Sequence, residues 1–127
     1  MKYALLIYSP ATAEEYAAAA TAGRQAVPGK GPWTDYTQAA KDAGVLVAAE
    51  QLTHTETATS VRVRGEDRLI TDGPFMETKE HLLGFYLIDV PDLDTALDWA
   101  ARMPAANIGT VEVRAAMTGM AWQRVLG

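Results

Sequence analysis

Three segments of this chain are apolar at nearly every position, and this feature constrains the fold most strongly. Residues 3–8, 45–52 and 85–90 are short runs of strand-forming residues, each with a proline or glycine close to one end. Successive side chains of a strand point to opposite faces of a sheet. These segments therefore predict a sheet that must be covered on both faces.

Helical patterns are expected in three other segments. Residues 12–23 predict a short helix, and residues 22–31 read as a loop because they hold two further glycines and a proline without periodicity. Apolar side chains recur at helical spacing over residues 32–43 and 93–101, which predict the two principal helices. Two such helices cover only one face of a sheet.

The expected helix ends carry recognisable capping residues. Thr12 and Glu15 have the spacing of a capping box, and Asp92 suits the N-cap of the last helix. Gly44 can adopt the left-handed conformation that ends the middle helix.

The order of elements predicts the fold class. A hairpin over residues 60–71 turns at Gly65-Glu66-Asp67, and a last strand spans residues 110–117. The resulting α+β plan is a ferredoxin-like β-α-β-β-α-β order with an added β-hairpin and an antiparallel sheet. We expect a single domain over residues 1–119 and a C-terminal tail over residues 120–127.

The uncovered sheet face predicts an oligomer. A second copy of the chain, packed sheet against sheet, is the simplest cover, because two-fold dimers are the commonest oligomers. We therefore expect a homodimer through the sheet face.

Composition excludes several kinds of chemistry. The 127 residues include no cysteine, which excludes disulfides, thiolate nucleophiles and cysteine-type metal sites. A formal charge of -5 disfavours nucleic acid and anionic membranes as partners. No apolar stretch is long enough to span a bilayer, and the N-terminal segment lacks a signal-peptide cleavage site. We expect a cytoplasmic protein.

A resemblance to a known family adds to this prediction. The segment Thr71-Asp72-Gly73-Pro74-Phe75, followed by Glu77-Thr78-Lys79-Glu80 and Gly84-Phe85-Tyr86, resembles the DGPF branch of the YCII-related family. The similarity extends over nearly the whole chain and takes in Met1-Lys2-Tyr3, Leu5-Leu6-Ile7-Tyr8, Ala43-Gly44-Val45-Leu46, the segment from Asp92 to Ala101, and Val111-Glu112-Val113-Arg114.

The resemblance implies a ferredoxin-like subunit that dimerises into an α/β barrel with a cleft near the dimer interface. It does not imply one activity. A few members of the family act as cofactor-free dehydrochlorinases on ring substrates, and some are associated with extracytoplasmic-function sigma factors.

The better-studied branch of the family carries a His and Asp pair that this chain lacks. By position, the His falls at Trp33, and the Asp, which precedes a proline after the second principal helix, falls at Met103. An indole and a thioether cannot move protons near neutral pH as an imidazole held by a carboxylate can. The departure argues against that mechanism here.

Three residues are candidates for catalysis. Asp72 begins a stiff turn at a strand end, where sites are commonly placed, although a turn without any substrate explains the same residues. His81 and Tyr36 are the other candidates. His81 and His54 are the chain's two imidazoles, and we expect both to be solvated.

A set of large apolar side chains is the candidate ligand-binding surface. Core and interface packing is the alternative explanation for the same residues. Together they could line an apolar pocket with phenolic handles. The candidates are Tyr8, Trp33, Phe75, Met76 and Phe85. No metal-ligand spacing and no phosphate-binding loop is present, so we expect no metal and no cofactor.

Two functions remain open. The first is a small-molecule-binding protein that takes a ring-containing organic compound, with lyase or isomerase chemistry assisted by Asp72, Tyr36 or His81. The second is a non-catalytic regulatory or protein-interaction module, linked to sigma-factor-dependent transcription.

Overall fold

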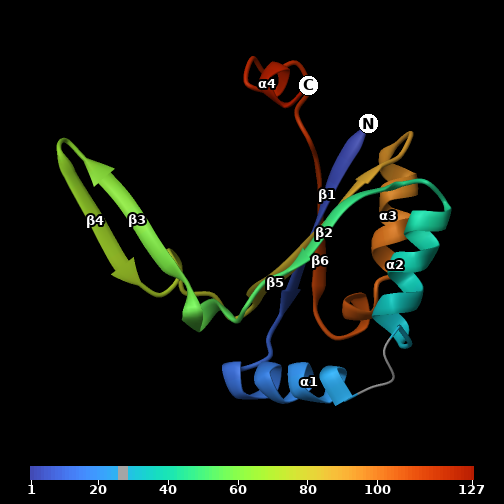
Figure 1. Cartoon of the computed structure of the whole chain (residues 1–127), viewed down its shortest axis with the longest axis horizontal. Helices are drawn as coiled ribbons and strands as arrows, with labels where there is room; N and C mark the ends of the chain where they lie inside the picture. The colour runs from blue at the N-terminus through green and yellow to red at the C-terminus, as the bar shows by residue number, and fades with distance from the viewer. Residues whose placement is uncertain (26–28) are drawn as a thin grey trace.

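The central element of the fold is a four-stranded antiparallel sheet. The computed structural model describes residues 1–25 and 29–127 (Figure 1). The sheet has the order β2-β5-β1-β6, and every neighbouring pair is antiparallel. Its strands are β1 (Lys2–Ser9), β2 (Leu46–Gln51), β5 (His81–Asp89) and β6 (Thr110–Ala115). This is the strand order that a ferredoxin-like chain produces, with β1 and β5 at the centre.

Two helices cover one face of this sheet, as the sequence predicts. Helices α2 (Pro32–Asp42) and α3 (Leu93–Ala101) lie side by side against it, and α1 (Ala13–Gln25) lies at one end of the sheet (Figure 1). The remaining helical turns are η1 (Thr55–Thr57), η2 (Pro104–Asn107) and α4 (Gln123–Leu126).

The predicted helix ends are confirmed by their hydrogen bonds. The backbone nitrogen of Glu15 donates to Thr12 Oγ1 and that of Thr12 to Glu15 Oε2, both at 3.2 Å, which makes a complete capping box. Asp92 Oδ1 accepts from the Thr95 hydroxyl at 2.7 Å and from the backbone nitrogen of Thr95 at 2.9 Å, and these two bonds, the first more than the second, lower the pKa of the Asp92 carboxyl. Gly44 ends α2 with a φ of 73°.

The two faces of the sheet differ in burial. On β1, Tyr3, Leu5 and Ile7 point into the core beneath α2 and α3 and are buried, whereas the intervening side chains are only partly buried. The same alternation runs along β5. We call the helix-free side the open sheet face and define it by its central apolar residues Ala4, Leu6, Tyr8, Phe85 and Leu87.

The hairpin forms a separate two-stranded sheet that extends away from the body of the molecule (Figure 1). It consists of β3 (Thr59–Arg64) and β4 (Asp67–Asp72), and we call it the arm. The arm exposes large apolar side chains, namely Val61, Val63, Leu69 and Ile70. The C-terminal segment also exposes large apolar side chains, namely Met117, Met120, Trp122, Val125 and Leu126.

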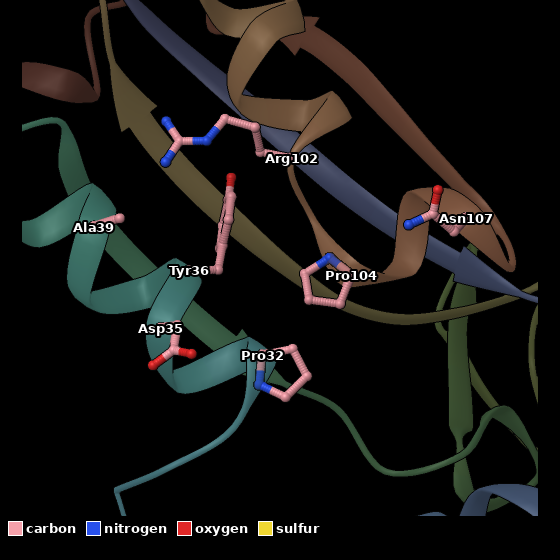
Figure 2. Close-up of a pocket in the computed structure, with 7 residues that line it drawn as sticks. All are labelled: Pro32, Asp35, Tyr36, Ala39, Arg102, Pro104 and Asn107. Atoms are coloured by element: carbon pink, nitrogen blue, oxygen red, sulfur yellow. The ribbon is translucent and has the colours of Figure 1, made fainter.

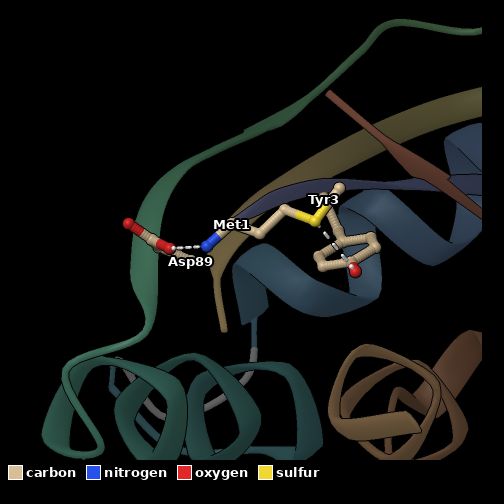
Figure 3. Close-up of polar contacts among 3 residues, drawn as sticks. All are labelled: Met1, Tyr3 and Asp89. Carbon is tan, nitrogen blue, oxygen red and sulfur yellow. Dashed lines mark hydrogen bonds and ion pairs between the residues drawn. The ribbon is translucent and has the colours of Figure 1, made fainter. Parts of the chain in front are cut away.

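The chain start is fastened to the end of β5. The N-terminal ammonium lies 2.8 Å from Asp89 Oδ1, and the Tyr3 hydroxyl donates to the sulfur of Met1 (Figure 3). The hydrogen bond from the ammonium, together with its charge, lowers the pKa of the Asp89 carboxyl.

The structure differs from the sequence prediction in local details. Helix α1 continues to Gln25, past the expected stop at Gly23, and residues 26–28 of the expected loop lie outside the described residues. The expected C-terminal tail contains the short helix α4. Within the described residues, no helix is both long and apolar enough to cross a membrane.

Candidate functional site

The candidate site is an open cleft between α2 and η2, at the end of α3 (Figure 2). Its volume is about 470 Å³, which is in the usual range for small-molecule sites. One wall comes from the first turns of α2, and the other from the chain that leaves α3 and enters η2. The cleft is lined by Pro32, Asp35, Tyr36, Ala39, Arg102, Pro104 and Asn107.

Tyr36 forms the floor of the cleft and is tied to the core. Its hydroxyl donates to the backbone oxygen of Trp99 at 2.9 Å, and the side chain is only 6% exposed. Burial of the phenol, with a smaller contribution from Tyr86, raises the pKa of Tyr36 to about 12. Tyr36 is therefore suited to packing and not to proton transfer near neutral pH.

Aromatic rings support the cleft from below. Tyr36 meets Tyr86 and Trp99 edge to face, with ring centroids 5.4 and 6.0 Å apart. Trp33 stacks on Tyr86 at 6.1 Å. Such pairs hold the rings in fixed positions, so the floor of the cleft is rigid.

Arg102 is the only cationic side chain on the cleft walls. It caps the C-terminal end of α3, and its guanidinium carbon lies 4.3 Å from the centre of the Trp99 ring. Across the described part of the chain, no carboxylate lies within 4.0 Å of its nitrogens. Its charge is therefore available to a ligand.

Trp33 and Met103 are the two positions at which the resemblance puts a His and Asp pair. Trp33 is the second residue of α2, and Met103 lies between Arg102 and Pro104, so both positions are next to lining residues in the chain although neither lines the cleft. Trp33 is 39% exposed, and Met103 is fully buried in the core. Neither side chain exchanges a proton near neutral pH, so such an acid–base pair is absent at these two positions.

Tyr8 and Phe85 lie on the open sheet face and not in the cleft. They alternate with Ile7 and Tyr86, which point to the helix-covered side. Phe85 is directly opposite Leu6 in the sheet, and Leu6 is opposite Glu112 on β6. Burial raises the pKa of Tyr8, and the Glu112 carboxylate raises it further. These two candidates thus belong to a different surface from Trp33 and Tyr36.

Asp72, Phe75 and Met76 lie at the root of the arm and are exposed. The turn is held by the backbone nitrogen of Gly73, which donates to Ala58 O at 2.7 Å, and by a further bond from Ser60 Oγ to Gly73 O at 2.9 Å. These bonds account for a stiff turn at Asp72 without a ligand.

The two histidines meet at the same root, and the expectation that both are solvated is wrong for His54. His54 is 5% exposed because its Nδ1 caps η1 by accepting from the backbone nitrogen of Glu56 at 3.2 Å, while its ring packs between Tyr16 and His81. The rings of His54 and His81 have centroids 4.6 Å apart, and Nδ1 of the partly buried His81 is enclosed without a hydrogen-bond partner among the described residues.

Of the predicted site residues, the structure therefore places only Tyr36 in the cleft lining. The Trp33 ring packs against Tyr36 at 6.3 Å but faces a neighbouring surface of α2, and the other candidates lie elsewhere. Arg102 and Asn107 were missed as site residues. The sequence signal was weak, because an arginine on the polar face of a helix is usually solvated. Within the described ranges 1–25 and 29–127, no group of three or more His, Asp or Glu side chains is arranged to hold a metal ion.

The fold and cleft together define a class of protein, namely a ferredoxin-like α+β chain with a solvent-open cleft beside its two covering helices. Residues 1–118 match the YCII-related domain family, and the chain belongs to that family.

A relative is found in Rhizobium meliloti (strain 1021), where it carries the name "Uncharacterized protein R00369". It is 47% identical over 75 residues, which cover 58% of this chain. The matched segment spans 60% of the relative's own length.

Proposed function

We propose that this YCII-related protein, of the family's DGPF branch, is a small-molecule-binding protein whose ligand occupies the cleft between α2 and η2. The observation that carries the proposal is the composition of the cleft. The hydrocarbon side chains of Pro32, Ala39 and Pro104 lie beside one cation, Arg102, that forms no ion pair within the described residues. Apolar walls with a few convergent polar groups are typical of ligand sites.

Binding is favoured over proton-transfer catalysis. The positions of the family's acid–base pair hold Trp33 and Met103, and the Tyr36 hydroxyl is committed to a backbone oxygen. Lyase or isomerase chemistry on a ring compound would need Asp72 or His81, and both lie at the root of the arm and do not line the cleft. The proposal therefore needs no cofactor and no metal.

We also propose that the working form is a homodimer, paired through the open sheet face into a dimeric α/β barrel. The open sheet face has an apolar centre, and Glu112 and Arg114 carry opposite charges along one edge of it. In a two-fold dimer this edge faces the same edge of the second copy, so the acidic position of one copy lies opposite the basic position of the other. The exposed arm would then lie against the second copy.

The exposed apolar surface also favours a second candidate function. A regulatory or protein-interaction module would present an arm such as this one to a different protein partner. The two candidates differ in a simple property, because only the first requires a small molecule to enter the cleft.

A fragment screen with matched variants tests the proposed function. Asp35→Trp places an indole in the cleft, whereas Asp94→Trp makes the same change in the first turn of α3, away from it. Ligand-detected NMR should find fragments that bind the wild-type chain and the Asp94 variant but not the Asp35 variant. Fragments that bind all three proteins equally, or no binding at all, would refute the proposal.

A further inference from the structure

We infer that the cleft selects a small organic monocarboxylate, which Arg102 binds through its guanidinium group; this inference rests on the ligand-binding function proposed above. Four features of the cleft support it. They are the unused hydrogen-bond donors, the position of Arg102, the position of Asp35 and the apolar remainder of the walls.

The polar groups on the walls differ in whether their donors are already used. The Tyr36 hydroxyl donates to Trp99 O, so it has no proton to offer a ligand. Within the described chain, the side chains of Arg102 and Asn107 donate to no protein acceptor. A ligand that forms hydrogen bonds with these two side chains must therefore carry acceptor atoms. Beside a guanidinium group, the favoured acceptor is an anion.

Arg102 is held in a position that suits a planar anion. Its guanidinium lies over the Trp99 ring at 4.3 Å, and this contact restricts the long side chain before any ligand arrives. The N–H groups at its edge form a fork that matches the two oxygens of a carboxylate. Figure 2 shows the guanidinium above the Tyr36 ring, on the cleft side of α3.

Asp35 limits the ligand to one negative charge. In Figure 2 its carboxylate lies at the opposite end of the cleft from the Arg102 guanidinium, next to Pro32, and the two groups form no ion pair. Asp35 therefore does not neutralise Arg102. It does repel a second anionic group at the far end of a ligand, which disfavours dicarboxylates.

Part of the remaining lining is apolar. Pro32, Ala39 and Pro104 add hydrocarbon surface, whereas the Tyr36 ring is buried and adds little. A volume of about 470 Å³ accommodates a ring-sized body beside the carboxylate. The ligand class is therefore an amphipathic monocarboxylate with an aromatic or alicyclic body.

Benzoate and benzamide test this inference directly, because they share one shape and differ in charge. Titrations of the full chain followed by ligand-detected NMR should show benzoate binding roughly tenfold more tightly than benzamide. Arg102→Met keeps much of the aliphatic stem over Trp99 and removes the charge. In that variant the affinity for benzoate should fall to that for benzamide, while benzamide binding stays unchanged.

A second variant guards against misfolding of the first. Asn107 is exposed, so Asn107→Asp should fold normally and weaken benzoate binding through charge repulsion. Equal binding of the two compounds to the wild-type chain, or undiminished benzoate binding by the Arg102 variant, would overturn the inference. If neutral fragments still enter the cleft, ligand binding stands and only the preference for a carboxylate fails. If no compound of any charge binds, the proposed function fails as well.

Discussion

Gly109 is the residue with the least room for a side chain. A Cβ atom at this position would overlap the backbone oxygen of Tyr8, where β6 approaches β1. Gly109→Ala must therefore push the two strands apart, and we expect it to lower the free energy of unfolding by about 3 kcal/mol or more.

The matched control for this substitution is Gly23→Ala. Gly23 lies in α1, and no atom would come within 4 Å of its added Cβ. The added methyl group should be neutral or stabilise the helix by up to about 1 kcal/mol. Urea unfolding of both variants measures the difference, and equal effects of the two substitutions would contradict the close approach of β6 to β1.

Tyr36 makes the stability of the protein depend on pH in alkaline solution. Its pKa is raised from 10.0 to about 12, so between these values the unfolded chain loses the phenolic proton while the folded chain keeps it. The contribution is complete below pH 10.0 and is lost as the pH rises towards about 12. Unfolding free energies of the wild type should therefore fall more steeply over this window than those of Tyr36→Phe. Identical slopes would show that the phenol is not buried as described.

Residues with local roles are the ones that the sequence predicts best. Thr12, Asp92 and Gly44 act on a helix end within a few residues, so their spacing is sufficient to identify them. The environment of His54 depends on His81, which is distant in the chain. The environment of Arg102 depends on α2, which forms the opposite wall of the cleft. No local pattern reveals such neighbours.

The arm is the element with the least support from the rest of the described chain. An isolated two-stranded hairpin is marginally stable in water, and among the described residues β3 and β4 pair as strands only with each other. Replacing residues 60–71 by a short glycine linker should therefore leave the four-stranded domain folded, with little change in its circular dichroism. The same deletion should weaken self-association, as measured by sedimentation equilibrium. Loss of the folded domain would show that the arm is part of the core, and unchanged association would show that it does not contact the second copy.

Elements and their order were largely predictable, because hydrophobic periodicity and turn residues act locally. The strand order then follows from the connectivity of a β-α-β-β-α-β chain. The bounds were less accurate where the signal is weak. The alanine-rich end of α1 has no strong stop, and α4 is too short for a periodic pattern.

The homodimer is a prediction for the whole molecule. Leu6 lies on the open sheet face, whereas Leu97 is an exposed leucine on α3. Leu6→Glu should shift the protein to a monomer, because it places a charge in the centre of the proposed interface. Leu97→Glu, the matched control, should leave association unchanged. A wild-type chain that sediments as a monomer at micromolar concentration, or a Leu6 variant that remains dimeric, would contradict the proposal.

The location of the candidate site was predictable only in part. The residues that the sequence offered lie on three surfaces, namely the cleft, the open sheet face and the root of the arm. Sequence patterns identify residue types, whereas the grouping of those types depends on which face of an element each one occupies.

The central claim is that a ligand occupies the cleft between α2 and η2, and amide chemical shifts test it most directly. A ¹⁵N-labelled wild-type chain titrated with benzoate should show saturable shifts concentrated at Tyr36, Ala39, Arg102 and Asn107, which line the cleft. Shifts confined to the root of the arm around Asp72 and Phe75, or no saturable shifts, would contradict the claim.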